Sequence, residues 1–281
     1  MELANVVLVM GKGGVGKTTV ARGIGAGLSR AGHRVVVLEL GAGAAGARQP
    51  EPGTSEAHET LSEDSALLET AAEIFGSQRV AHWLFGNFAI KRLIGVVPGV
   101  REYCLVVAAR QRLARFERVV VDMPATGHGI AWLSAAHKLA RLVPHGKARS
   151  QADALDSALR NPRETSYVLV TLPEPLVLAE SAELERALRE RLGVQIDQYV
   201  MNRVPDEPEV YETDLEALLQ GDASMASAVA ELRLWAGARR AVRAQAATLG
   251  RAARTHILGE RAGMYNALAV GTALGFAGGA R

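Results

Sequence analysis

The feature that most constrains the fold of this chain is a glycine-rich loop close to its amino end. Residues 11–18 read GKGGVGKT, with an apolar run over residues 6–9 before them and a helical pattern over residues 18–30 after them. A G-x-x-x-x-G-K-T loop between a strand and a helix predicts a phosphate-binding loop, because its glycines let successive backbone N–H groups converge on phosphate oxygens. The start of the helix adds its partial positive charge to the same anion.

Three side chains have roles that follow from this motif and its surroundings. Lys17 is expected to reach the β- and γ-phosphates of a nucleotide, and the hydroxyl of Thr18 is expected to hold Mg²⁺. Asp122 follows the apolar run 119–121, and a carboxylate at the carboxyl tip of a strand beside such a loop is where Mg²⁺ or its water is held. Taken alone, Asp122 has the pattern of a helix cap, but beside the loop the sequence favours a metal-side role.

Alternating strand and helix patterns favour a mostly parallel sheet with helices on both faces. Strands are expected over residues 5–10, 34–40, 118–122, 167–172 and 195–202. Helices are expected, among other places, over residues 128–142, over residues 178–192 with Gly193 as the cap, and over residues 223–253. The predicted fold is therefore an α/β three-layer sandwich of the P-loop NTPase kind, with residues 1–281 forming a single domain.

Three segments interrupt this alternation. Residues 41–60 are rich in Gly, Ala, Pro and Glu, and they predict a long loop. Residues 61–116 predict a helical insertion on the sheet, in which the apolar stretch 83–97 lines either a client groove or the core of the insertion itself. Residues 213–281 predict a weakly defined helical tail, whose last part from residue 256 either adds a strand or is poorly ordered.

Composition narrows the classes of function. The net charge is only +2, which gives no argument for a nucleic-acid partner. Cys104 is the only cysteine, so a disulfide framework within the chain is excluded and a reducing cytoplasm is the expected setting. No run reaches the roughly 18 uncharged apolar residues that a spanning helix needs, so no stable membrane span is expected.

Four sequence runs occur in a fixed order: GKGGVGKTT at 11–19, VVVDMPATGH at 119–128, VTLPEPLVLAES at 170–181 and VMNR at 200–203. Together they resemble the arsenite-pump (ArsA-type) ATPase family, which includes the tail-anchored-protein targeting ATPases. The loop alone resembles the deviant Walker A loop of a wider class that also contains ParA, MinD and the nitrogenase iron protein. The resemblance covers roughly residues 6–203. It implies an ATP- and Mg²⁺-dependent ATPase that works as a homodimer or as a heterodimer with a paralogue.

The resemblance also implies roles for individual residues. Lys12 would reach across the dimer and stabilise charge at the partner's nucleotide, much as an arginine finger does. Residues 124–128 would sense the γ-phosphate, and Asn202 would hydrogen-bond adenine. The helical insertion would move with nucleotide state and open or cover a client surface. The triphosphate would be held by Gly11, Lys12, Gly13, Gly14, Val15, Gly16, Lys17, Thr18 and Thr19.

The chain departs from the family pattern at several places. The family's switch-one aspartate, which orients the attacking water, is absent after the second strand. Glu39 is the nearest carboxylate, and it either takes over that catalytic role or merely ends the strand. Cys104 alone cannot bind a metalloid within one chain, so arsenite transport is disfavoured, and the Cys-x-x-Cys pair of the zinc-bridged targeting ATPases is absent.

Two other functions stay open on the sequence. A positioning or partitioning ATPase of the ParA or MinD kind would carry the same loop. A pseudo-ATPase subunit would bind nucleotide and pair with a more competent paralogue, as the missing switch-one aspartate suggests. The sequence does not identify the client protein.

Overall fold

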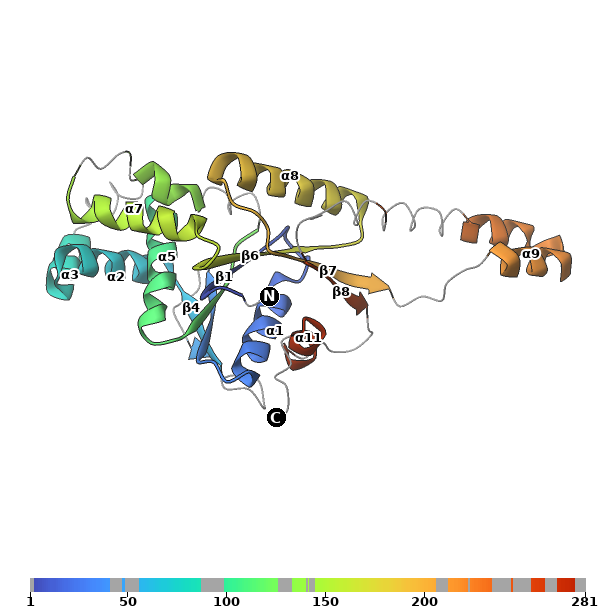
Figure 1. The fold of residues 1–281 in the computed structure, drawn as a ribbon, viewed down its shortest axis with the longest axis horizontal. Helices are drawn as coiled ribbons and strands as arrows, with labels where there is room; N and C mark the ends of the chain where they lie inside the picture. Colours follow the sequence, from blue (N-terminus) through green and yellow to red (C-terminus); the bar gives the residue numbers. More distant parts are fainter. Residues whose placement is uncertain are drawn as a thin grey trace.

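The computed structural model of this protein describes residues 3–40, 47–48, 56–86, 99–125, 133–139, 141, 145–205, 212–221, 223–233, 244, 254–260 and 267–275. Their strands form one sheet in the order β3-β4-β2-β5-β1-β6-β7-β8 (Figure 1). Neighbouring strands are parallel except for the antiparallel pair β3 and β4. The strands are β1 (Val6–Met10), β2 (Val35–Leu40), β3 (Ala47–Arg48), β4 (Ala57–Leu61), β5 (Arg118–Asp122), β6 (Thr165–Thr171), β7 (Gln198–Pro205) and β8 (Arg254–Glu260).

The middle of the sheet is apolar on both faces. Every residue of β1 and of β6 is buried. Parallel strands covered by helices on both sides are continuous apolar runs rather than alternating ones, and VVLVM in β1 fits that rule. The predicted mostly parallel sheet and its α/β class are confirmed.

Helices cover the sheet in two layers, which completes the predicted three-layer arrangement (Figure 1). Helices α1 and α11 pack on one face, and α2, α5, α7 and α8 contribute to the core on the other face. The helices are α1 (Lys17–Arg30), α2 (Glu63–Phe75), α3 (Gln78–Gly86), α5 (Val100–Gln111), α7 (Lys147–Arg160), α8 (Pro175–Leu192), α9 (Glu212–Gly221) and α11 (Ala267–Ala273), with short 3-10 turns at Arg112–Ala114 and Ala223–Met225. In Figure 1, α9 lies well away from the sheet.

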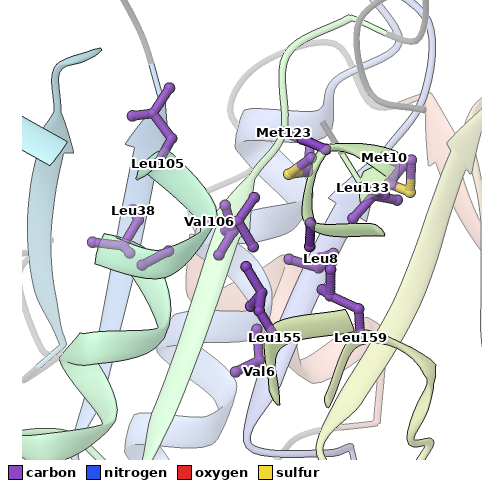
Figure 2. Packing of buried hydrophobic residues seen from close by; sticks show 14 of the residues in the cluster. Val6, Leu8, Met10, Leu38, Leu105, Val106, Met123, Leu133, Leu155 and Leu159 are labelled. Atoms are coloured by element: carbon purple, nitrogen blue, oxygen red, sulfur yellow. The ribbon is translucent and has the colours of Figure 1, made fainter. Parts of the chain in front are cut away.

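Large aliphatic side chains fill the core under α5 and α7. Figure 2 shows Val6 and Leu8 of β1 close to Leu155 and Leu159 of α7, with Val106 of α5 beside them. All five are buried. The burial of such side chains is the main force that holds these helices to the sheet.

The segment between β2 and α2 corrects one prediction. Residues 57–61, placed in or next to a long loop by their composition, form strand β4, which pairs with β2 in parallel. Glu56 and His58 are both buried here, at 1% and 7% exposure, and their side chains lie 3.3 Å apart. Polar residues paired inside the fold resemble loop residues in composition, which is why the strand was missed. The helical insertion therefore begins at α2 rather than at residue 61.

The carboxyl-terminal segment corrects a second prediction. A helical tail was expected over residues 213–281, but residues 254–260 form strand β8, parallel to β7. The alternative that the last part adds a strand is the correct one. After it, α11 packs against α1, with Val270 and Leu274 buried in the same core as the α1 side chains. The long helix expected over residues 223–253 is helical at 226–233, and most of its remainder lies outside the described residues.

Several element bounds also differ from the predictions. Helix α8 begins at Pro175, three residues before the expected start, because proline suits the first turn of a helix, where its missing N–H costs nothing. Its predicted end at Gly193 is confirmed, with that glycine at φ 67°. Of the helix expected over 128–142, residues 133–139 are helical. Within the described part of the chain, no helix combines the length and apolarity required to cross a bilayer.

Candidate functional site

The loop between β1 and α1 has the tight backbone that its glycines predict. Gly11 and Gly16 have φ values of 148° and 95°, which side chains other than glycine rarely adopt. A Cβ at Gly11 would lie 2.3 Å from the carbonyl oxygen of Val170, and one at Gly16 would lie 2.3 Å from Nδ2 of Asn202. The loop is thus pressed against β6 and β7, and its shape excludes larger residues at both positions.

Lys17 and Thr18 begin helix α1 at this loop. The Nζ of Lys17 donates a hydrogen bond of 2.8 Å to the carbonyl oxygen of Lys12, so its charge lies inside the curve of the loop. Partial burial lowers the pKa of Lys17 from its ordinary value, and the nearby Asp122 opposes this. A desolvated ammonium that is only partly compensated by the protein suits an anionic ligand.

Asp122 lies where the sequence predicts, at the end of β5 beside α1. The hydroxyl of Thr18 donates a hydrogen bond of 2.5 Å to its Oδ2. Its Oδ1 is buried and has no hydrogen-bond partner among the described residues. Burial raises the pKa of the Asp122 carboxyl, and the bond from Thr18 and the charge of Lys17 act to lower it. A cation at this point would satisfy the orphaned oxygen.

Glu39 is brought to the same place by strand register. It lies on β2 directly opposite Asp122 on β5, so the two carboxylates are neighbours on one face of the sheet. The Nη2 of Arg22 on α1 contacts Glu39 Oε1 at 2.6 Å. Glu39 thus lies beside Asp122 and is held in an ion pair by a helix residue, and its catalytic role stays a prediction.

Lys12 is also held within the chain. Its Nζ lies 2.8 Å from Oε1 of Glu180 on α8, and the two side chains are 37% and 36% exposed. The other carboxylate oxygen of Glu180 is buried without a partner in the described structure. The next residue, Ser181, has its hydroxyl 2.9 Å from Oγ1 of Thr171 at the end of β6, which fixes this part of α8 against the sheet.

Asn202 supports the loop from the side of β7. Its Nδ2 donates a 2.9 Å hydrogen bond to the carbonyl oxygen of Val15, and its Oδ1 accepts one of 2.9 Å from the N–H of Arg203. The β7–β8 pairing is irregular between Met201 and Val204, and Arg203 has a φ of 53°. Such a bulge re-aims a side chain, here toward the loop. Contact of Asn202 with adenine stays a prediction.

Two more of the predicted residues, Thr19 and Ala125, fall on or near the loop. Thr19 follows Thr18 in the first turn of α1 and is partly exposed. Ala125 lies against the loop, since a Cβ added at Gly13 would be 3.8 Å from the Cβ of Ala125. Residues 126–128, the rest of the segment expected to sense the γ-phosphate, lie outside the described residues.

The geometry is that of a nucleotide-binding P-loop, and the comparison with protein families agrees. The family described as the CobQ/CobB/MinD/ParA nucleotide-binding domain matches residues 6–232. The chain belongs to this nucleotide-binding family. Its match begins at β1 and extends beyond α9, so it includes the loop, Asp122 and Asn202.

Individual relatives are more distant. The ATPase BagA of Mycobacterium tuberculosis is 27% identical over 220 residues, which cover 70% of this chain. A putative arsenical pump-driving ATPase 1 of Aquifex aeolicus is 26% identical over 256 residues, which cover 72% of this chain. In both cases the match spans 64% of the relative's own length. These proteins support the nucleotide-binding class, and the ArsA-type resemblance is a likeness rather than a demonstrated membership.

Two side chains at the site were not predicted. Arg22 carries no motif, and only its spacing of four residues from Thr18 on a helix signals that both face the same way. Glu180 is part of the run LPEPLVLAES, which pointed to a family but not to a contact with Lys12. Both contacts join residues far apart in the sequence, and pattern reasoning does not find such pairs.

Proposed function

We propose that this protein is a Mg²⁺-dependent ATPase that hydrolyses ATP as a dimer and couples nucleotide state to a client or partner protein. The observation that carries this proposal is the buried, unpartnered oxygen of Asp122, next to the hydroxyl of Thr18 and the P-loop. A nucleotide-binding loop needs a glycine cradle, but a hydrolase also needs a carboxylate on its metal side. This chain has both in one place.

Thr18 and Asp122 are the residues that would hold the metal. Their oxygens are the hard ligands that Mg²⁺ prefers, and a nucleotide-bound Mg²⁺ needs only one or two protein ligands because phosphates and waters complete its shell. Their present hydrogen bond joins two groups that would both turn to the ion. Bound Mg²⁺ would supply neutralisation of charge across the β- and γ-phosphates.

The chain's own residues account for the remaining chemistry. Lys17 would leave the carbonyl of Lys12 and bind the phosphate oxygens, since its charge is already partly desolvated. Glu39 would accept a hydrogen bond from the water that attacks the γ-phosphorus in line, as the bond to the bridging oxygen breaks. Lys12 of the second subunit would stabilise the developing charge.

A partner surface would lie on the helical segment. Phe75, Val80 and Trp83 of α2 and α3 are 53%, 41% and 78% exposed, which is unusual for large apolar side chains on one short stretch. Their helices stand on the sheet face opposite α1, so movement of the loop and of β5 can reach them through α5. The proposed setting is the cytoplasm, in keeping with the free thiol of Cys104.

Calorimetry and steady-state turnover test the proposal together. Mg²⁺ and ATP should bind with measurable heat, and turnover per chain should rise with protein concentration because the dimer is the active form. An Asp122→Asn variant should retain nucleotide binding without metal and lose the Mg²⁺-dependent gain in affinity. A wild-type protein that binds no nucleotide, or whose turnover per chain is the same at every dilution, would contradict the proposal.

A pseudo-ATPase subunit is the second candidate, and one observation favours it. Within the chain, Lys12 forms an ion pair with Glu180, and Glu39 forms one with Arg22. Both side chains are therefore engaged by the protein itself rather than free to act on a nucleotide. Single-turnover hydrolysis separates the candidates. A wild-type rate equal to that of the Lys17→Ala control favours the pseudo-ATPase.

A further inference from the structure

Two side chains of α1 contact two neighbouring strands at the site. Thr18 and Arg22 are four residues apart and therefore lie one helical turn apart on the same face. Thr18 Oγ1 is 2.5 Å from Asp122 Oδ2, and Arg22 Nη2 is 2.6 Å from Glu39 Oε1. The two acidic residues are register partners on β5 and β2, so the helix and the sheet are joined by two neighbouring contacts, one at Asp122 and one at Glu39.

The contact between Arg22 and Glu39 brings a positive charge to a strand carboxylate, which a metal-binding contact does not need. Partner residues on neighbouring strands lie about 4.8 Å apart, so the acidic side chains of Glu39 and Asp122 are neighbours, and two carboxylate charges side by side repel each other. Glutamate also has one more rotatable bond than aspartate, and its carboxylate needs an anchor to stay in one place. A planar guanidinium that grips one carboxylate oxygen supplies both the counter-charge and the anchor.

Packing of α1 does not depend on this pair. Val20, Ile24 and Leu28 of the helix are buried in the core on that face of the sheet. Gly25 brings the helix backbone next to Val37, so the helix is already seated close to β2. The Arg22 and Glu39 side chains, by contrast, are 29% and 24% exposed, at the end of the strand where the loop opens.

We infer that Arg22 is a positioning residue for hydrolysis: it holds the carboxylate of Glu39 beside Asp122, where Glu39 accepts the hydrogen bond of the attacking water. The inference rests on the proposed ATPase function and deepens it. It assigns to an arginine–glutamate pair the task that a lone aspartate performs in related loops. Arg22 does not touch the nucleotide in this scheme and acts only through Glu39.

Three variants and a matched control test the inference. In Arg22→Gln the kcat for ATP should fall by about 10- to 100-fold, the size of loss expected when a reacting group is misplaced by an ångström. The KM for ATP and the affinity for a non-hydrolysable ATP analogue, measured without turnover, should stay unchanged. Arg22→Lys, which keeps the charge, should recover a large part of kcat. Adding Glu39→Gln to Arg22→Gln should cause little further loss of kcat, because each change disables the same Arg22–Glu39 pair.

The control is Arg110→Gln. Arg110 also contacts a glutamate, Glu164, at 2.5 Å, but next to the amino ends of β1 and β6, at the edge of the sheet opposite the loop. It should leave kcat unchanged, and the melting temperature of each variant shows whether folding is intact. A kcat in Arg22→Gln equal to that of the wild type would overturn the inference. So would a raised kcat in Arg22→Gln, which would mean that Arg22 holds Glu39 away from the water. Failure of Arg22→Lys to recover kcat would overturn it as well. A wild-type protein that hydrolyses no more ATP than Lys17→Ala would overturn both the proposed function and this inference. That measurement needs no Arg22 variant, so it separates a failure of the proposed function from a failure of the inference alone.

Discussion

The two faces of the sheet are packed in different ways. On the α1 face, glycines bring backbones together: a Cβ at Gly25 would lie 2.4 Å from Val37, and one at Gly271 would lie 2.4 Å from the carbonyl oxygen of Gly23. On the opposite face, leucine, valine and methionine side chains fill the space between the sheet and its helices (Figure 2). We call the α1 face the close face, because its helix backbones approach the sheet and each other closely. This face carries Thr18 and Arg22. From this face the two side chains reach the strand carboxylates of Asp122 and Glu39.

The two lysines of the loop divide between these faces. Lys17 opens α1 and belongs to the close face. Lys12 is held by Glu180 of α8, a helix whose Leu178, Leu184 and Leu188 pack on the opposite face. The loop thus lies where the two layers meet, and a change in either layer can be transmitted to it. We expect changes on the close face to alter turnover, and changes on the opposite face to alter stability alone.

The largest effect is expected from Lys17→Ala. Removing the ammonium that neutralises the phosphates should reduce ATP turnover to background and weaken nucleotide binding, because the Lys17 ammonium is the charge that lies against the backbone of the loop. Turnover by a phosphate-release assay and binding by calorimetry check this. Undiminished turnover would rule out the assigned site.

Lys12→Ala should separate binding from hydrolysis. If its charge acts in the second subunit, turnover should fall by about 10²- to 10³-fold while ATP binding stays close to that of the wild type. Mixing this variant with Lys17→Ala chains should restore part of the activity, since each supplies what the other lacks. Activity of Lys12→Ala equal to wild type at every protein concentration would argue against a role across a dimer.

Leu105→Ala tests the opposite face. Leu105 on α5 is 1% exposed, and its truncation should cost about 2–5 kcal/mol of unfolding free energy through lost burial and a residual cavity. Denaturant unfolding measures that loss. At a temperature where the variant is folded, its kcat should match the wild type, and a large drop in kcat would erase the contrast between the faces.

Gly25→Ala tests the close face. The added methyl meets Val37, so the expected loss of stability is about 1–3 kcal/mol, offset by up to about 1 kcal/mol from the better helix propensity of alanine. The kcat should also fall, because α1 must move away from β2 and carry Thr18 and Arg22 with it. Adding Val37→Ala should restore kcat by making room. A Gly25→Ala variant that loses stability but keeps its full kcat would contradict the proposed dependence on close packing.

The smallest effect is expected from Glu180→Gln. This change releases Lys12 from its ion pair, which is more than one third exposed and is therefore weakened by solvent. The protein concentration for half-maximal turnover should fall by no more than about fivefold. A dilution series measures it, with Glu183→Gln on the same helix as the control. A rise in that concentration would mean that Glu180 supports the active dimer instead.

The sequence places Lys17, Thr18 and Asp122 close together, and they do lie together in the structure, because most of these positions follow from a local pattern. The loop, Lys17 and Thr18 are contiguous, and Asp122 could be placed beside them because strands of a parallel sheet end at one edge. Strand β4 and strand β8 were missed or left open for the opposite reason. Each has polar or exposed residues, such as Glu59 in β4 and the 66% exposed Ile257 in β8, and takes its strand form from its neighbour.

The amino-acid order alone determined that this chain makes a buried strand, a glycine turn and a helix start that together bind phosphate. That much depends on residues within about one turn of each other, whose conformations are set by local sterics and hydrogen bonding. Only the tertiary structure decided which charges meet there. Arg22 faces Glu39, and Lys12 faces Glu180, across 17 and 168 residues of chain. Such pairs depend on strand register and helix distance, which are fixed by packing of the whole core rather than by any short stretch of sequence.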